Sequence, residues 1–211
     1  AVTFLATLAI QLEFAIFVGV LASLFVYLNR TTHPHLTSVV PDPRSPLRRF
    51  MPASEATAQC PQLVMLRVDG SLFFGAVEHV GDELQAVRER EPERRHILLI
   101  GSGINFIDVA GAELLVQEAN LMRDAGGFLY LCNLKPGVRI VLERGGFLDL
   151  IGRDNVFGNK DEAIRAIYAR LDAAKCRGCT ARIFEECKSL LPDGSRRATN
   201  DPATTAASRN P

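Results

Sequence analysis

The sequence INFIDVAGAELLVQEANLMRDAGG, residues 104–127, contains the pattern that decides the fold. Apolar residues recur in it every three or four positions, as they do on the inward face of an amphipathic helix. They are Val109, Ala112, Leu115, Val116, Ala119 and Met122. Asp108 stands where its side chain can cap the first free backbone amides, and Gly126 and Gly127 end the helix. The stretch therefore predicts a strand-to-helix junction at Asp108.

Two apolar runs flank this helix and extend the pattern. Residues 96–101 (HILLIG) precede it and residues 128–134 (FLYLCNL) follow it, and continuous runs of this length are typical of strands covered on both faces. The rest of the chain alternates in the same way. Its segments are residues 62–70 and 71–75 (extended), a helix from 77 that ends near REREPERR (88–95), 135–147 (helical) and 155–171 (a brief strand, then a helix capped by Asn159). This alternation predicts an α/β sandwich with a mixed, partly parallel sheet.

The overall composition excludes two classes of protein. Of the 211 residues, 47% are hydrophobic and 23% are charged, which is enough apolar material for a buried core and excludes disorder throughout. Lys plus Arg number 24, equal to Asp plus Glu, and no basic stripe with interleaved aromatic residues is present. We therefore expect no nucleic-acid partner.

The first 28 residues differ from the rest, because Glu13 is their one charged side chain. We expect the end of one apolar helix over residues 2–10, a break, and a second helix from about residue 14 to residue 28, both at the end of a transmembrane domain. Glu13 is then either a functional carboxylate at membrane depth or a surface residue in the break. A buried hairpin in a water-soluble protein is the alternative for the whole segment.

Positive charge follows the apolar run at Arg30, Arg44, Arg48 and Arg49. By the positive-inside rule, this places the remainder of the chain in the cytoplasm of an integral membrane protein, in the inner membrane if the source is bacterial. The chain begins with Ala instead of Met, so we expect it to be part of a longer protein.

The chain is expected to divide into four parts: residues 1–29 as the end of a transmembrane domain, 30–59 as a linker, 60–174 as the globular domain, and 175–211 as a cysteine-containing extension and tail. Prolines at 34, 41, 43 and 46 predict an extended connector for the linker. His33 and His35 are expected to be exposed there and not to bind metal. From Pro192 onward the composition predicts disorder.

Residues 101–108 (GSGINFID) are expected to form a loop at the carboxyl end of a strand, where sheets of this type bind ligands. The loop lacks the Rossmann, Walker and nucleophile-elbow patterns. Ser102 has no evident base beside it, and Asp108 is expected to be a helix cap. We therefore expect no enzymatic activity, no catalytic residue and no cofactor, but a loop that binds a ligand or partner. Its residues are Ser102, Asn105, Asp108, Val109, Ala110 and Gly111.

The order of these motifs resembles the STAS domain, the fold of bacterial anti-sigma factor antagonists and of the cytoplasmic tails of sulfate permease (SulP) family transporters. The Asp-x-x-Gly junction of Asp108 and Gly111 is its most specific element, and the resemblance covers about residues 60–174. The apolar start of the chain is similar to the closing transmembrane segments of SulP transporters. The resemblance implies the carboxy-terminal part of a transporter for sulfate, bicarbonate or another small inorganic anion.

The resemblance also implies a role for the junction. In the soluble antagonists a serine that is phosphorylated stands just before the glycine, whereas this chain has Ala110 there, so that switch is absent. A regulatory or interaction module in a homodimer is expected, with a nucleotide or regulatory protein as a further partner of the loop. A membrane-tethered regulatory or nucleotide-binding STAS protein without transport, and an α/β enzyme for a phosphorylated substrate, are the alternatives.

Five cysteines remain, an odd number in a chain that we place in the cytoplasm, so we expect reduced thiols instead of disulfides. The segment CRGCTARIFEEC places Cys176, Cys179 and Cys187 in a C-x-x-C pair with a third thiol. One such pair is a weak zinc signal, because the fourth ligand would have to be remote, so we expect no metal site; a metal site and a redox pair are the alternatives to reduced thiols.

Overall fold

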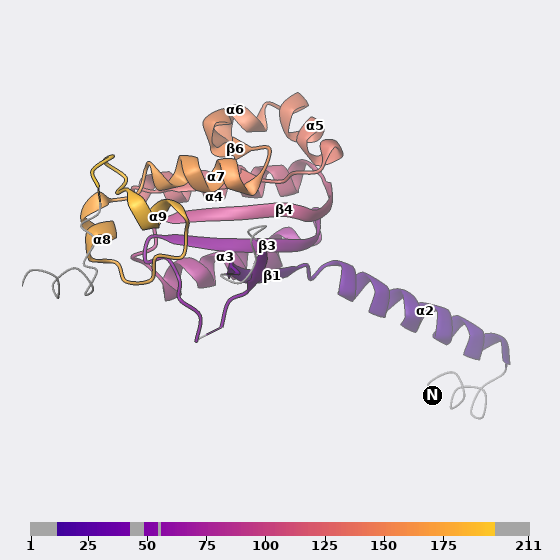
Figure 1. The fold of residues 1–211 in the computed structure, drawn as a ribbon. Coiled ribbons are helices and arrows are strands. Elements are labelled where there is room, and N and C mark those ends of the chain that lie inside the picture. The colour runs from indigo at the N-terminus through magenta and orange to yellow at the C-terminus, as the bar shows by residue number, and fades with distance from the viewer. Residues whose placement is uncertain (1–11, 43–48, 55, 197–211) are drawn as a thin grey trace, which may run out of the picture.

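The computed structural model describes residues 12–42, 49–54 and 56–196, and Figure 1 shows its fold. A six-stranded sheet lies at its centre in the order β2-β1-β3-β4-β5-β6. The strands are β1 (His35–Pro41), β2 (Phe50–Pro52), β3 (Leu63–Leu72), β4 (His96–Ile107), β5 (Phe128–Cys132) and β6 (Val156–Phe157). Strands β3 to β6 run parallel to one another, and β1 is antiparallel to both of its neighbours. The predicted mixed, partly parallel α/β fold is confirmed.

Helices cover both faces of this sheet and form a three-layered domain (Figure 1). The helices of the described residues are α2 (Leu12–Thr31), which does not cover the sheet, and α3 (Val77–Arg90), α4 (Val109–Asp124), α5 (Pro136–Arg144), α6 (Phe147–Ile151), α7 (Lys160–Tyr168), α8 (Ala173–Gly178) and α9 (Glu186–Ser189), with a short 3-10 helix at Arg153–Asn155. Helices α3 to α6 pack on one face, and α7 to α9 pack on the other. The expected helices after residue 76 are all present.

The two faces of the sheet bury two separate apolar cores. Along β4, Leu99 faces the core under α3 to α6, while its neighbour Leu98 faces the core under α7 to α9. Successive side chains of β4 therefore enter opposite cores. Because both faces of this central parallel strand are covered, its residues 97–100 are apolar in an unbroken run. Full burial of one leucine side chain contributes about 1.5–3 kcal/mol, so these strands supply a large share of the stability.

Two stretches of the segment expected to be a connector, β1 and β2, are strands of the sheet. Four residues of β1 pair with β3, as Leu36 does with Val68, and Val39 pairs with Pro52 of β2. From the sequence we predicted only an extended connector here, and we did not predict that the segment pairs with the sheet. Pro34 and Pro41 lie just before β1 and at its last residue, where a proline does not interrupt the ladder.

Helix α2 projects from the domain (Figure 1). It starts at Leu12, two residues before the expected start, and its apolar side chains are largely exposed, as at Phe17 and Phe25. The expected helix over residues 2–10 and the side chain of Glu13 lie outside the described residues. Within the described ranges, no helix has the combined length and apolarity needed to cross a bilayer.

The far end of the chain departs from the sequence prediction in one respect. Residues 192–196 were expected to begin a disordered tail, yet Leu191 N donates to Ser195 O at 2.8 Å and Leu190 pairs with Arg196 in a short bridge. The buried side chain of Leu191 holds this turn against the domain. The prediction for residues 197–211 concerns a segment outside the described residues.

Candidate functional site

Strand β4 continues through the segment that was expected to be a binding loop. Gly103, Ile104 and Ile107 still pair with β3, so residues 101–107 are strand and the predicted loop conformation was wrong. The last pair of β4 with β5 is Ile100 with Cys132, which leaves the remainder of β4 bonded on one side. Ser102 and Asn105 are exposed on this overhang, and Asn105 Oδ1 accepts a hydrogen bond from Lys135 Nζ.

Asp108 ends the strand and caps α4, as the sequence predicted. Its Oδ1 accepts a hydrogen bond from the Gly111 amide at 2.9 Å, and its Oδ2 accepts one from the Phe74 amide at 3.0 Å. Its own amide donates to Leu72 O at 3.1 Å. Both carboxylate oxygens therefore serve the junction between two strand ends and a helix start, which agrees with a structural cap.

The next three residues have different environments. Val109 is 59% exposed, so its expected inward orientation was wrong; it occupies the first position of α4, before the helix turns toward the core. Ala110 is half-buried and Gly111 is buried. A Cβ on Gly111 would lie 2.4 Å from Leu72 O, so glycine allows the helix start to approach the end of β3.

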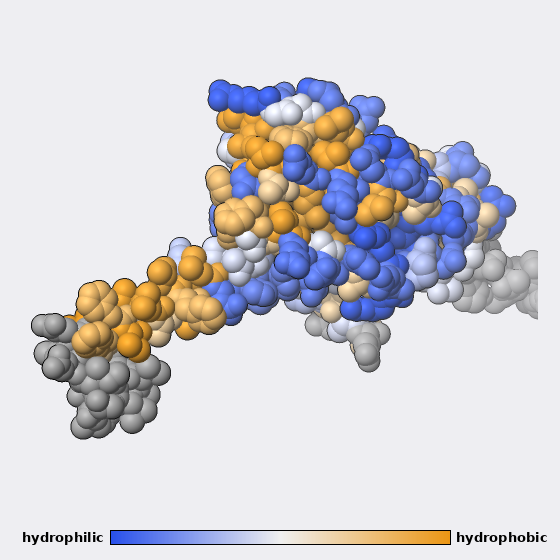
Figure 2. Space-filling model, turned by 180° about the vertical axis from the view of Figure 1, so that it is seen from behind, coloured by the Kyte–Doolittle hydropathy of each residue, from blue (hydrophilic) through white to orange (hydrophobic). Residues whose placement is uncertain are grey.

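Exposed apolar side chains surround this junction. Phe74 is 76% exposed and Phe106 is 55% exposed, and together with Val109 they flank the Asp108 cap. We call these three side chains the apolar end surface. Figure 2 shows apolar residues gathered on the side of the domain from which α2 leaves. Large exposed apolar groups that cluster are typical of a contact surface.

The end of α2 lies beside this surface. A Cβ on Gly75 would lie 3.2 Å from Thr32 Cγ2, and the rings of His33 and His79 have centroids 4.7 Å apart. His33 thus contacts α3, and His33 and His35 belong to no metal-binding group among the described residues. The apolar end surface and the exposed apolar helix α2 therefore occupy the same end of the domain.

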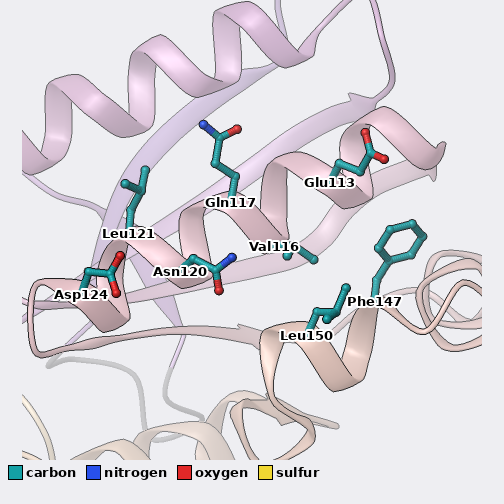
Figure 3. Close-up of a pocket in the computed structure, with 8 residues that line it drawn as sticks. All are labelled: Glu113, Val116, Gln117, Asn120, Leu121, Asp124, Phe147 and Leu150. Atoms are coloured by element: carbon teal, nitrogen blue, oxygen red, sulfur yellow. The ribbon is translucent and has the colours of Figure 1, made fainter.

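A groove runs along α4, between α4 and α6 (Figure 3). Its volume is about 380 Å³. Val116 of α4 faces Phe147 and Leu150 of α6 across it, and Leu150 is 55% exposed. Leu121 also lines the groove, and the polar side chains of its lining are Glu113, Gln117, Asn120 and Asp124. The groove offers apolar contact with a polar rim, as protein-binding surfaces commonly do.

A family model for the STAS domain matches residues 55–163, about half of the chain. The chain belongs to the STAS domain family. The junction at Asp108 and Gly111 lies inside the matched residues, whereas α2, β1, β2 and the cysteine-containing extension after α7 lie outside them.

Relatives of this STAS protein fall into two groups. "Solute carrier family 26 member 10" of Mus musculus is 27% identical over 187 residues, which cover 85% of this chain and 28% of the relative. BtrV of Bordetella bronchiseptica, assigned as an anti-sigma factor antagonist, is 36% identical over 97 residues, which cover 42% of this chain and 82% of BtrV. Other relatives are named as sulfate transporters of Arabidopsis thaliana. The chain thus spans about a quarter of the length of the transporter relatives that it matches.

The fold of a solved transporter is also similar. The murine Solute Carrier 26 family member A9 anion transporter, in its inward-facing state, has a TM-score of 0.62 with this chain at 19% identity, covering 78% of this chain and 27% of that one. At this identity the likeness concerns the fold. It extends beyond the residues matched by the STAS model, since 78% of the chain exceeds that match.

Sequence reasoning missed Phe74 and Phe106 as parts of the candidate site. Each lies at the end of an apolar run, where a core position is the usual interpretation. One signal could have found Phe106: it lies between Asn105 and Ile107 at the end of β4, and strand alternation places it opposite the buried Ile107.

Proposed function

We propose that this chain is the carboxy-terminal part of a SulP-type anion transporter of the sulfate or bicarbonate class. The observation that carries the proposal is the extent of the likeness. The match to a solute carrier covers 85% of the chain and therefore includes residues outside the STAS domain, whereas the match to BtrV covers 42%. In this proposal α2 belongs to the end of the membrane domain, and the STAS domain lies in the cytoplasm as a regulatory module.

The exposed apolar residues of α2 support this assignment. A helix that is apolar on most of its circumference needs other helices or lipid around it, and Phe17, Leu21 and Phe25 are each more than 60% exposed. The small residues Gly19, Ala22 and Ser23 recur at helical spacing, which permits close packing against neighbouring membrane helices. The residues that hold the transported anion would then lie in membrane segments that precede this chain.

The apolar end surface is, in this proposal, the part of the STAS domain that contacts the membrane domain. It lies where α2 joins the sheet, so a domain held by α2 would present Phe74, Phe106 and Val109 toward the membrane side. The junction would act through binding and not through catalysis, because both oxygens of Asp108 already accept backbone hydrogen bonds. Ala110 lacks the hydroxyl that a phosphorylation switch would require.

Transport by the full-length parent protein tests the proposal. In reconstituted vesicles we expect uptake of labelled sulfate or bicarbonate, and no uptake by the chain of residues 1–211 alone. Absence of uptake of any small inorganic anion, with nucleotide or protein binding to the tail, would instead support a membrane-tethered regulator. Turnover of a phosphorylated metabolite that is lost in Ser102→Ala or Asp108→Ala would support the enzyme alternative.

A further inference from the structure

Helix α4 separates two hollows on the outer side of the layer formed by α3 to α6. One is the groove between α4 and α6 (Figure 3), and the other, of about 460 Å³, lies between α3 and α4. Glu113, Gln117 and Leu121 line both of them. The two hollows therefore adjoin across α4, and we call the residues that line them the α4 surface. The apolar end surface contributes no residue to it.

Exposed apolar side chains lie in the α4 surface. Leu121 of α4 is 41% exposed, and Leu150 of α6 is 55% exposed. Val116 faces Leu150 and the half-buried Phe147 across the groove (Figure 3). A partner that covered these side chains would remove them from water. Apolar hollows of this kind accept the anchor side chains that contribute most of the binding energy at protein interfaces.

Carboxylates give the α4 surface a negative charge. Glu78 and Asp82 lie on α3, and Glu113 and Asp124 lie on α4. None of these four exposed side chains has an ion-pair partner among the residues that the structure describes. Glu78 and Asp82 are four positions apart on one helix, where like charges repel each other. A cation of a partner, bound beside them, would relieve this repulsion.

Two arginines lie near these carboxylates without balancing their charge. Arg88 forms an ion pair with the buried Glu118, so its charge is already compensated. The Arg123 guanidinium donates to Asn120 Oδ1 at 2.8 Å and to Leu150 O at 3.1 Å, which holds it against α6. Negative charge therefore predominates on the α4 surface and favours a cationic partner.

The course of α4 shows in which direction a bound segment would extend. The helix begins next to Asp108, at the end of the domain from which α2 leaves, and its last residue is Asp124. From Glu113 to Asp124 it rises about 16 Å. A segment in the groove would thus extend away from α2 and from the membrane, and the carboxylates would be repelled by anionic lipid headgroups. The α4 surface is therefore suited to a cytoplasmic protein.

We propose that the α4 surface binds an amphipathic helix of a cytoplasmic partner protein. Apolar anchors of this helix enter the groove between α4 and α6, and its Lys or Arg side chains meet the carboxylates of α3 and α4. The apolar residues recur at i, i+3, i+4 and i+7, the pattern with which helices dock in apolar grooves. The complementary charges select the partner more than they add affinity. The inference rests on the proposed function only for the cytoplasmic position of the domain.

Two synthetic peptides test this inference on the chain of residues 1–211, held in nanodiscs of phosphatidylcholine. The basic peptide is a helix of about 16 residues with leucine at the spacing given above and lysine elsewhere. The acidic peptide has glutamate in place of each lysine. Fluorescence anisotropy of the labelled peptides, corrected for binding to empty nanodiscs, gives the dissociation constants. We expect the basic peptide to bind at least about tenfold more tightly than the acidic one, and added salt to weaken its binding.

Matched variants locate the binding. Asp82→Lys should weaken the basic peptide about fivefold and strengthen the acidic one, whereas Glu83→Lys makes the same exposed charge change on α3 outside the α4 surface and should have little effect. Leu150→Ser should weaken the basic peptide about tenfold. Its control is Ile140→Ser, because Ile140 is 47% exposed on α5 and lines neither hollow. Circular dichroism shows that each variant is folded.

Three outcomes would overturn the inference. The first is a basic peptide that binds no more tightly than the acidic one. The second is parental affinity in the folded variants Asp82→Lys and Leu150→Ser. The third is an equal loss in Asp82→Lys and Glu83→Lys, which would show that the peptide responds to net charge alone. None of these outcomes depends on whether the full-length protein transports anions, which the uptake experiment decides separately.

Discussion

The carboxylate of Asp108 accepts a hydrogen bond from the backbone amide of Phe74, a residue 34 positions earlier in the chain, at 3.0 Å. The same carboxylate caps α4 through the Gly111 amide. One side chain thus joins the turn after β3 to the start of the helix after β4. The position of Phe74 in the apolar end surface consequently depends on the carboxylate of Asp108.

Asp108→Ala should lower the free energy of unfolding by about 1–3 kcal/mol, because it removes a helix cap and leaves a second amide without its acceptor. Asp108→Asn should lose less, since an amide oxygen can still accept one of the two bonds. Denaturant unfolding followed by circular dichroism measures both. Asp124→Ala, at the exposed far end of α4, is the matched control, and an Asp108→Ala variant no less stable than this control would contradict the assigned role.

Gly111→Val should lower the free energy of unfolding by about 1–3 kcal/mol, since the new side chain would force α4 away from the end of β3. A Cβ at this position would lie 2.4 Å from Leu72 O. Ala110→Ser should unfold at nearly the parental temperature, because Ala110 is half-buried and its hydroxyl would reach solvent. Thermal melts of the two variants compare these effects, and equal melting temperatures would show that the junction is placed wrongly.

Sequence reasoning found the strands and helices whose side chains are buried, because burial leaves a periodic pattern. It failed where pairing is decided by distant residues. The overhang of β4 is a strand because β3 continues beside it to Leu72, and nothing within residues 101–107 reveals that partner. In the same way, β1 is a strand because it pairs with the edge of β3 around Val68, and nothing within β1 reveals that partner.

The candidate site was predicted in part for a similar reason. The roles of Asp108 and Gly111 follow from local geometry: Asp108 caps α4, and Gly111 lets the start of α4 approach the end of β3. The residue types and their spacing in the sequence were therefore enough to predict the junction. Val109 was misplaced because helical periodicity does not fix how the first turn meets the core.

Phe74→Ser and Phe106→Ser should leave the unfolding temperature of the chain nearly unchanged, since both side chains are more than half exposed. In the full-length protein, each change should reduce anion uptake, because the apolar end surface would lose its contact with the membrane domain. Uptake in vesicles, normalised to the amount of folded protein, measures the effect. Leu190→Ser, an exposed apolar position on the extension, is the control. Uptake equal to this control would remove the surface from the proposed interface.

His96 and Arg170 provide a pH test at the opposite end of the sheet. The pKa of His96 is lowered first by burial and then by the positive charge of Arg170. Its Nδ1 lies 3.4 Å from Tyr130 Oη, and the Arg170 guanidinium lies over the Tyr130 ring, 5.7 Å from its centroid. The folded state therefore favours the neutral imidazole more than the unfolded state does. Stability from His96 is present above the unfolded pKa, near 6.5, and is lost as pH falls toward the folded pKa.

Arg170→Gln should raise the pKa of His96 part of the way toward 6.5, because the charge is removed while the burial remains. The acid-side loss of stability should then become smaller, although the overall stability at neutral pH should fall by about 0.5–1 kcal/mol with the lost cation–π contacts. Nuclear magnetic resonance titration of the His96 ring gives the pKa, and urea unfolding between pH 5 and 8 gives the stability profile. Arg165→Gln, on the exposed face of α7, should change neither quantity. A His96 pKa that is equal or lower in Arg170→Gln would show that the charge of Arg170 does not reach the imidazole.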